Sequence, residues 1–195
     1  MVIAAILLAA DDAAINGVPL ALLPWGDDQT LIEYHVAQLQ AAGANVIEVV
    51  LGYDAERIIP LVARDNVEPI VNARWQDDAA SALRVGATAV PRETTAAIVA
   101  RVDEPRAAYV YRQLLDEHLR SGSAITRVGG AASTPIVVNP AVLAELRNTS
   151  NDAGGLDAIL ARHAHETATV GSDDDGALPH IKDASSLAEA REQLH

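Results

Sequence analysis

The sequence has no cysteine and no phenylalanine, and its one lysine is Lys182. The absence of cysteine excludes disulfide bonds, thiolate metal sites and a cysteine nucleophile. Cations are scarce, because 13 arginines and one lysine stand against 27 acidic residues, which gives a formal net charge of −13. A chain with so few cations offers no basic surface to a phosphate backbone, so we expect no nucleic-acid partner.

The sequence also lacks an apolar run long enough to cross a bilayer. The run at residues 2–10 is too short, and no basic residue precedes it, so it does not read as a signal peptide. We therefore expect a cytoplasmic protein with no membrane partner. With 195 residues and 50% hydrophobic content, the chain can form one domain with a full core, which we place at residues 1–195.

The apolar run at residues 2–10 shows no alternation of polar and apolar positions. This pattern is typical of a β-strand that is buried on both faces of a parallel sheet. In such sheets the loop after the first strand often binds phosphate, because glycines let the backbone amides approach and the next helix presents its positive end. Residues 11–20 are therefore the first place to look for chemistry.

Strand-like and helix-like segments alternate along most of the chain. Strands are expected at 2–10, 45–52, 67–72, 96–102, 124–128, 135–138 and 167–170, and helices at 30–43, 54–64, 79–90, 109–119, 140–146, 156–163 and 185–194. Thr30 and Glu33 form a capping box at the start of the first helix, and Gly43 ends it. Pro60 should lie near the first turn of its helix or kink it. The order predicts an α/β fold with a three-layer, doubly wound, mostly parallel sheet.

Residues 8–24, LAADDAAINGVPLALLP, resemble the signature of nucleotidyltransferases of the molybdenum cofactor cytidylyltransferase and guanylyltransferase type. That signature runs L-A-A-G-x-S-x-R-M-G-x-P-K, and the matching positions are Leu8, Ala9, Ala10, Gly17 and Pro19. The resemblance extends over residues 3–191. It implies a Rossmann-like fold of the GT-A type and transfer of a nucleotidyl group from CTP or GTP to a molybdopterin-like phosphate, with Mg²⁺ and release of pyrophosphate.

The sequence departs from this signature where the triphosphate would bind. The loop glycine is Asp11, the serine is Ala13, the arginine is Ile15 and the lysine is Leu20. Two unit charges about 5 Å apart interact by about 3 kcal/mol at an effective dielectric of about 20. Losing one cation and gaining one anion beside a triphosphate therefore removes several kcal/mol, which corresponds to orders of magnitude in rate.

Further departures follow along the chain. The family segment G-M-S-S-S-L reads DAASAL here and keeps Ser81, and the family stretch G-D-x-G-A-R keeps Asp152 but has Leu156 at its arginine. Thr134 replaces the histidine of the family's G-H-P. The late acidic pair, which helps to hold Mg²⁺ in the family, is replaced by His180 and Lys182.

Asp103 remains as the candidate metal ligand, because it directly follows a buried strand. It could equally cap the segment that starts at Ala107. The acidic pairs at 11–12 and 77–78 should lie at the cleft mouth, where they could bind a cation or an arginine-rich partner, or simply be solvated. We expect His163 and His165 to be surface residues, because two helical positions that are two apart face different ways.

These observations predict a family member that keeps the fold without the standard catalytic set, so no catalytic residue is assigned. The inherited nucleotide-binding positions are Leu8, Ala9, Ala10, Asp11, Gly17, Ser81 and Asp152. Such a protein would act by binding a protein partner or a small ligand, with no cofactor of its own. Two alternatives remain open. One is an active nucleotidyltransferase that uses CTP or GTP with Mg²⁺ on Asp103 and either Asp11 or Asp152, and the other is a structural subunit of a larger assembly.

Overall fold

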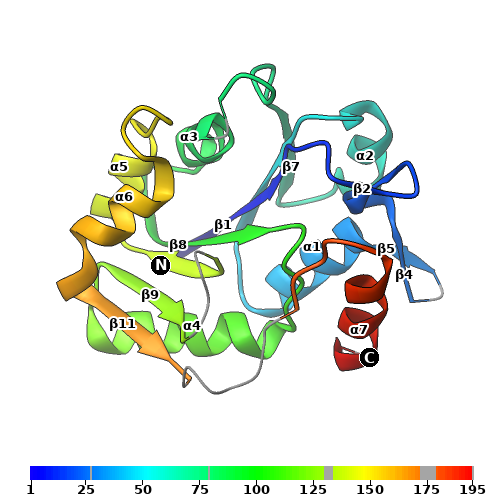
Figure 1. Cartoon of the computed structure of the whole chain (residues 1–195). Helices are drawn as coiled ribbons and strands as arrows, with labels where there is room; N and C mark the ends of the chain where they lie inside the picture. Colours follow the sequence, from blue (N-terminus) through cyan, green and yellow to red (C-terminus); the bar gives the residue numbers. More distant parts are fainter. Residues whose placement is uncertain (27, 79, 130–133, 172–178, 195) are drawn as a thin grey trace.

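The computed structural model describes residues 1–26, 28–78, 80–129, 134–171 and 179–194. Its centre is a seven-stranded sheet with helices on both faces (Figure 1). In spatial order the strands are β11 (Thr167–Val170), β9 (Ile125–Val128), β10 (Ile136–Val138), β8 (Thr94–Arg101), β1 (Val2–Ala9), β6 (Val46–Leu51) and β7 (Val67–Val71). β10 runs antiparallel to both neighbours, and the other pairings are parallel. The expected mostly parallel α/β architecture is confirmed.

Two apolar cores lie on the two faces of the sheet. One core packs the sheet against α1 (Leu31–Ala41), α2 (Ala55–Val62), α4 (Ala108–Ser121) and α7 (Ala184–Leu194), and the other packs it against α3 (Ala80–Ala89), α5 (Pro140–Leu146) and α6 (Gly155–Arg162). Side chains of β1 point alternately into the two cores. Ala5 and Leu7 belong to the first core, and Ala4 and Ile6 belong to the second. This double burial explains why the first apolar run shows no alternation.

The helix boundaries follow the expected signals with one exception. The Thr30 N–H donates to a Glu33 carboxylate oxygen at 2.8 Å, which confirms the capping box of α1. Pro60, expected near the first turn or at a kink, lies inside α2 near its carboxyl end. A proline there cannot donate a backbone hydrogen bond, and α2 ends at Val62. No helix in the described ranges is both long and apolar enough to span a membrane.

The segment after β1 differs from the phosphate-binding loop that its position suggested. It forms a small hairpin of β2 (Ala14–Ile15) and β3 (Val18–Pro19), followed by the 3-10 helix η1 (Leu20–Leu22) and a second hairpin of β4 (Pro24–Trp25) and β5 (Gln29–Thr30). Asn16 and Gly17 connect β2 to β3 with φ angles of 53° and 79°. Positive φ at both positions is the mark of a type I′ hairpin turn, for which Asn-Gly is a preferred pair. A second 3-10 helix, η2 (Ala164–Glu166), precedes β11.

The C-terminal part of the chain returns to the end of β8. The Ile181 N–H donates to the Asp103 carbonyl at 2.7 Å, and Arg106 Nη1 donates to the Pro179 carbonyl at 2.6 Å. α7 then packs Leu187 into the first core and lies beside the hairpin of β4 and β5, where Arg191 donates to the Pro24 carbonyl (Figure 1). The segment before α7 is therefore fixed against the carboxyl end of the central sheet.

Candidate functional site

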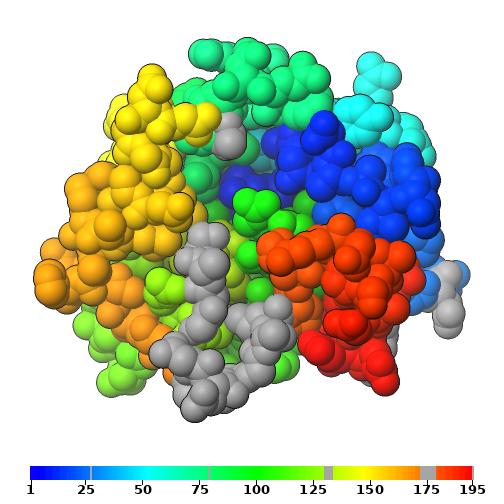
Figure 2. All heavy atoms as spheres, in the orientation of Figure 1, coloured from blue at the N-terminus to red at the C-terminus, as the bar shows by residue number. Residues whose placement is uncertain are grey.

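A cleft opens at the carboxyl ends of β1 and β8, the edge at which open α/β sheets bind ligands. Its larger part, of about 500 Å³, is lined by Leu8, Ala80, Leu83, Arg101, Thr134, Asn151, Gly154, Gly155, Leu156 and Asp157. Its smaller part, of about 230 Å³, is lined by Leu8, Ala10, Asp11, Asn72, Trp75, Asp78, Ala82 and Arg101. Leu8 and Arg101 line both parts, so the two adjoin. Figure 2 shows a hollow on this face, bordered by the α6 region, the residues after β1 and the segment before α7.

Arg101, the last residue of β8, links the two parts of the cleft. Its Nε and Nη2 donate to Asp103 Oδ1 and Oδ2 at 2.9 and 3.0 Å, a bidentate pair. His180 Nε2 lies 3.1 Å from Asp103 Oδ2, and Arg101 Nη2 lies 4.0 Å from Asp11 Oδ2. The structure thus brings together Asp11, Asp103 and His180 from three distant segments around an arginine that sequence reasoning missed. The sequence signal that could have identified Arg101 is its position as a cationic residue at the end of a mostly apolar strand.

The charged groups in this cluster shift one another's pKa values. Burial alone would raise the pKa of Asp103, but the Arg101 hydrogen bonds and charge, with His180, bring it below its ordinary value. Burial raises the pKa of Asp11, although the Ala13 N–H partly opposes this by donating to its carboxylate. The hydrogen bond to Asp103 raises the pKa of Arg101. The pair of Arg101 and Asp103 is therefore held in its charged form.

A divalent metal does not fit this arrangement. Mg²⁺ binds carboxylate oxygens directly, and both oxygens of Asp103 already accept from Arg101, one of them also lying beside His180. Among the described residues, no group of three or more histidine, cysteine or acidic side chains is placed to hold a metal ion. For the alternative role of Asp103 as a cap of the segment that starts at Ala107, the structure shows that the Ala108 N–H at the start of α4 donates to Gln38 Oε1 at 2.9 Å.

The residues at the inherited loop positions lie in different parts of the structure. Leu8, Ala10 and Asp11 line the cleft, whereas Ala9 faces the core on the opposite side of the sheet. Gly17 lies in the turn of the first hairpin and lines neither part of the cleft. The substituted positions Ile15 and Leu20 belong to the core, with exposures of 8% and 3%. The position of the family lysine therefore points into the core of this chain.

Ser81 and Asp152 do not line the cleft. Ser81 is 1% exposed, and its hydroxyl accepts from Asn72 Nδ2 at 2.7 Å and donates to the Arg74 carbonyl at 3.3 Å. Asp152 is exposed in the turn before α6, while its neighbour Asn151 lines the larger part of the cleft. These contacts give Ser81 a structural role in holding the strand end of β7 to α3.

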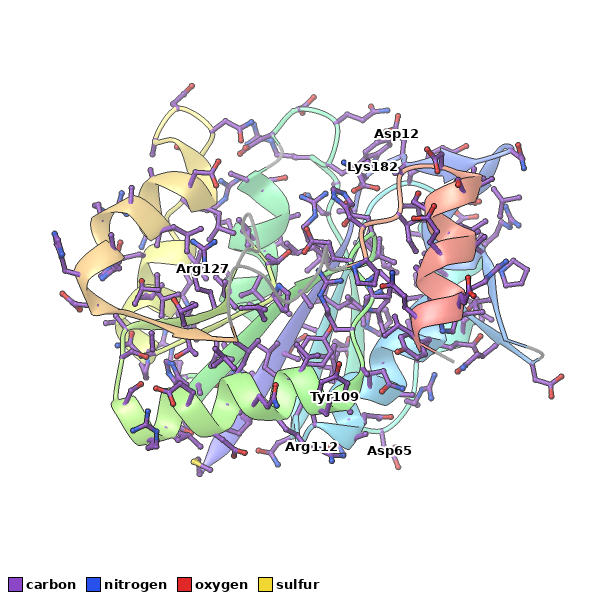
Figure 3. The ribbon with its side chains drawn as sticks, turned by 60° about the horizontal axis from the view of Figure 1, so that its bottom comes forward. Asp12, Asp65, Tyr109, Arg112, Arg127 and Lys182 are labelled. Carbon is purple, nitrogen blue, oxygen red and sulfur yellow. The ribbon has the colours of Figure 1, made fainter. Side chains whose placement is uncertain are left out.

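Some of the acidic residues expected at the mouth of the cleft pair with arginines. Asp78 lines the smaller part of the cleft, and its carboxylate accepts from Arg84 at 3.2 Å. Asp77 is exposed and lies 3.9 Å from Arg74. Asp12 is exposed, and Figure 3 shows it with Lys182 along the same edge of the molecule. The cleft mouth is therefore acidic, with arginines interspersed.

Trp75 forms an aromatic wall of the smaller part of the cleft, which the sequence analysis did not identify. Its ring meets that of Tyr53 edge to face, with centroids 5.9 Å apart. Gly52, just after β6, allows its backbone to pack closely against Ala10 and the Trp75 ring. A Cβ at this position would lie 2.1 Å from the Ala10 carbonyl oxygen and 2.7 Å from Trp75 Cγ. The wall is thus built by the close approach of the ends of β1 and β6.

The two histidines near α6 differ from each other. His165 is exposed, as expected. His163 is of intermediate exposure, because its side chain is 17% exposed and its Nε2 lies 2.7 Å from Glu145 Oε1. Arg162 pairs with the same carboxylate at 2.7 Å, and this hydrogen bond lowers the pKa of Glu145. The group ties α6 to α5 outside the cleft.

Comparison with known proteins identifies the family of this fold. A structure of Rv0371c from Mycobacterium tuberculosis H37Rv is 21% identical, with 97% of each chain covered and a TM-score of 0.79. A further structure of that protein, described as a complex with manganese, is 21% identical with both chains fully covered (100%) and a TM-score of 0.78. A nucleotidyl transferase from Methanothermobacter is 16% identical, with 98% of this chain and 97% of that chain covered and a TM-score of 0.81.

These similarities, all below 25% identity, establish the fold. No curated protein matches the chain in sequence. The model of the MobA-like NTP transferase domain, however, matches residues 5–167, which is most of the chain and includes the strands that build the cleft. The expected relationship to nucleotidyltransferases is thereby confirmed, and the chain belongs to the family of MobA-like NTP transferase domains.

Proposed function

We propose that this protein binds a small ligand in its cleft and does not transfer nucleotidyl groups. The observation that carries the proposal is the state of Asp103, whose two carboxylate oxygens are engaged by Arg101 and His180. The positive charge and hydrogen bonds of Arg101 disfavour a metal ion on this carboxylate, and nucleotidyl transfer from a triphosphate depends on a cation that neutralises the phosphates. The family lysine cannot compensate, because its position holds the core residue Leu20.

The charge of the cleft supports a ligand with little negative charge. Of the residues that line it, Asp11, Asp78 and Asp157 are acidic, and Arg101 is basic. Arg84 offsets Asp78, which leaves Arg101 between Asp11 and Asp103. A free triphosphate carries about four negative charges and would be repelled here by about 3 kcal/mol for each unpaired carboxylate at about 5 Å. Uncharged or weakly charged molecules escape this cost.

A small molecule suits the cleft better than a protein partner. The two parts together offer a concave site, with Trp75 on one side and the apolar side chains of Leu8 and Leu83 in its lining. Concave sites with apolar walls and a few convergent polar groups are typical of small-molecule binding. We also propose a cytoplasmic role connected with the molybdenum cofactor, because residues 8–24 resemble the signature of the molybdenum cofactor nucleotidyltransferases.

Release of pyrophosphate tests the absence of transfer. CTP, GTP and ATP are incubated with the protein and either Mg²⁺ or Mn²⁺, the second because the Rv0371c relative is described as a manganese complex. We expect no release above the background without protein. The proposal fails if release is observed and is lost in Asp103→Ala but kept in Asp116→Ala, which changes an exposed acid on α4.

Trp75 fluorescence tests binding. The second tryptophan, Trp25, is fully buried and gives a constant background, whereas Trp75 lines the smaller part of the cleft. Cytidine and guanosine should change the emission at lower concentration than CTP and GTP, because the acidic cleft disfavours the triphosphates. Trp75→Phe should abolish the change. Tighter binding of the Mg²⁺-triphosphates than of the nucleosides would contradict the proposal and favour the active nucleotidyltransferase.

A further inference from the structure

We propose that the guanidinium of Arg101 is a built-in counter-ion of the cleft that occupies both carboxylate oxygens of Asp103 and keeps divalent metal ions out. This inference rests on the proposed function and names the residue responsible for it. The argument uses three properties of the cluster, namely the position of Arg101, the groups around it and the chemistry of guanidinium.

Arg101 lies between a buried carboxylate and the open cleft. The Asp103 side chain is 9% exposed, while the Arg101 side chain is 42% exposed and lines both parts of the cleft. On its other side Arg101 Nη2 reaches to 4.0 Å from the Asp11 carboxylate. An ion that enters from the cleft therefore meets the guanidinium before it can reach Asp103.

Without the guanidinium, the carboxylates of Asp103 and Asp11 would lose the cation that both of them face. Both oxygens of Asp103 would then be released from Arg101, and His180 Nε2 lies 3.1 Å from one of them. A carboxylate is a ligand that Mn²⁺ accepts, so a freed Asp103 would attract it. The cluster is thus an acidic pocket filled by a cation of the protein itself.

A guanidinium is well suited to this exclusion. Its planar fork engages both carboxylate oxygens at once, as the distances of 2.9 and 3.0 Å to Asp103 show, and an ammonium group cannot do this. Arginine also stays charged at every pH at which the protein is folded. A metal ion would have to break both hydrogen bonds and remain beside a positive charge, so the two cations exclude each other.

Mn²⁺ alone is the probe that tests this inference. Its affinity is measured by calorimetric titration and by loss of the free Mn²⁺ signal in electron paramagnetic resonance. We expect weak binding by the unchanged protein and at least about tenfold tighter binding by Arg101→Ala, because the repulsion is removed and Asp103 is freed. The double variant Arg101→Ala with Asp103→Asn should lose this gain.

A matched control separates the effect from a general change in charge. Arg120 also forms a bidentate pair, with Glu117 at 2.8 and 3.0 Å, on the exposed surface of α4. Arg120→Ala alters the net charge by the same amount and should leave Mn²⁺ affinity unchanged. Equal gains in Arg120→Ala and Arg101→Ala would overturn the inference.

The inference is also overturned if the unchanged protein binds Mn²⁺ as tightly as Arg101→Ala, or if a folded variant shows no gain. Folding is checked by circular dichroism. Arg101→Gln, which keeps much of the side-chain length and removes the charge, replaces Arg101→Ala if the latter is unfolded. The result is independent of the pyrophosphate assay, because transfer by the unchanged protein would refute the proposed function, whereas the Mn²⁺ titration reports on Arg101 alone.

Discussion

Replacing Leu20 by lysine would restore the family lysine in sequence, and the structure predicts that it damages the fold instead. Leu20 is 3% exposed and packs in the core shared with α1 and α2. Removing a fully buried leucine side chain costs about 1.5–3 kcal/mol. An ammonium group placed there without a partner adds about 1–3 kcal/mol of desolvation. We therefore expect Leu20→Lys to lower the free energy of unfolding by about 2.5–6 kcal/mol.

Urea unfolding followed by circular dichroism measures this change. The matched control is Val18→Lys, since Val18 lies in β3 of the same segment and is 36% exposed. That variant should stay within about 0.5 kcal/mol of the unchanged protein. Neither variant should gain affinity for Mg²⁺-CTP. The reasoning is refuted if Leu20→Lys is as stable as Val18→Lys and binds Mg²⁺-CTP more tightly, because its side chain would then reach the cleft.

Two further predictions concern buried polar groups. Arg106 is 3% exposed and donates to the Pro179 carbonyl beside Glu104, so Arg106→Met should lower the unfolding free energy in urea by about 3–5 kcal/mol. A loss below about 1 kcal/mol would contradict this account. Burial lowers the pKa of His35 to about 4, whereas its ordinary value in an unfolded chain is about 6.5. Between about pH 4 and 6.5, His35 is therefore protonated in the unfolded chain and neutral in the folded protein. The stability that neutral His35 contributes to the fold is complete above about pH 6.5 and is lost as the pH falls toward about 4. The stability difference between the unchanged protein and His35→Gln should shrink by about 3 kcal/mol over this range, and a difference that is constant with pH would refute the assignment.

The strands and helices of the sheet were predictable because their signals are local. The first strand was recognisable from its unbroken apolar run, and α1 from its capping box. The hairpin of β2 and β3 was missed although Asn16-Gly17 is a strong local signal for it. The resemblance to a phosphate-binding loop outweighed that dipeptide, and the substitutions at Ile15 and Leu20 were interpreted as lost contacts when they are core contacts.

The site was harder to predict because it depends on contacts between distant segments. Asp103 could be identified as important from its place after a strand, but its partners could not. Arg101 is two positions away and His180 is 77 positions away, and only the fold shows that all three meet. Sequence also gives no side-chain direction, which is why Ser81, buried against Asn72, was assigned to the nucleotide site.

The return of the segment at 179–183 to β8 has a consequence for how the protein is made. Ribosomes add about 5–20 residues per second, so the 77 positions between Asp103 and His180 correspond to about 4–15 s of synthesis. Arg101 and Asp103 are two positions apart and are therefore synthesised almost together, at the start of that interval. His180 is therefore the last member of this charge cluster to be synthesised, seconds after Arg101 and Asp103.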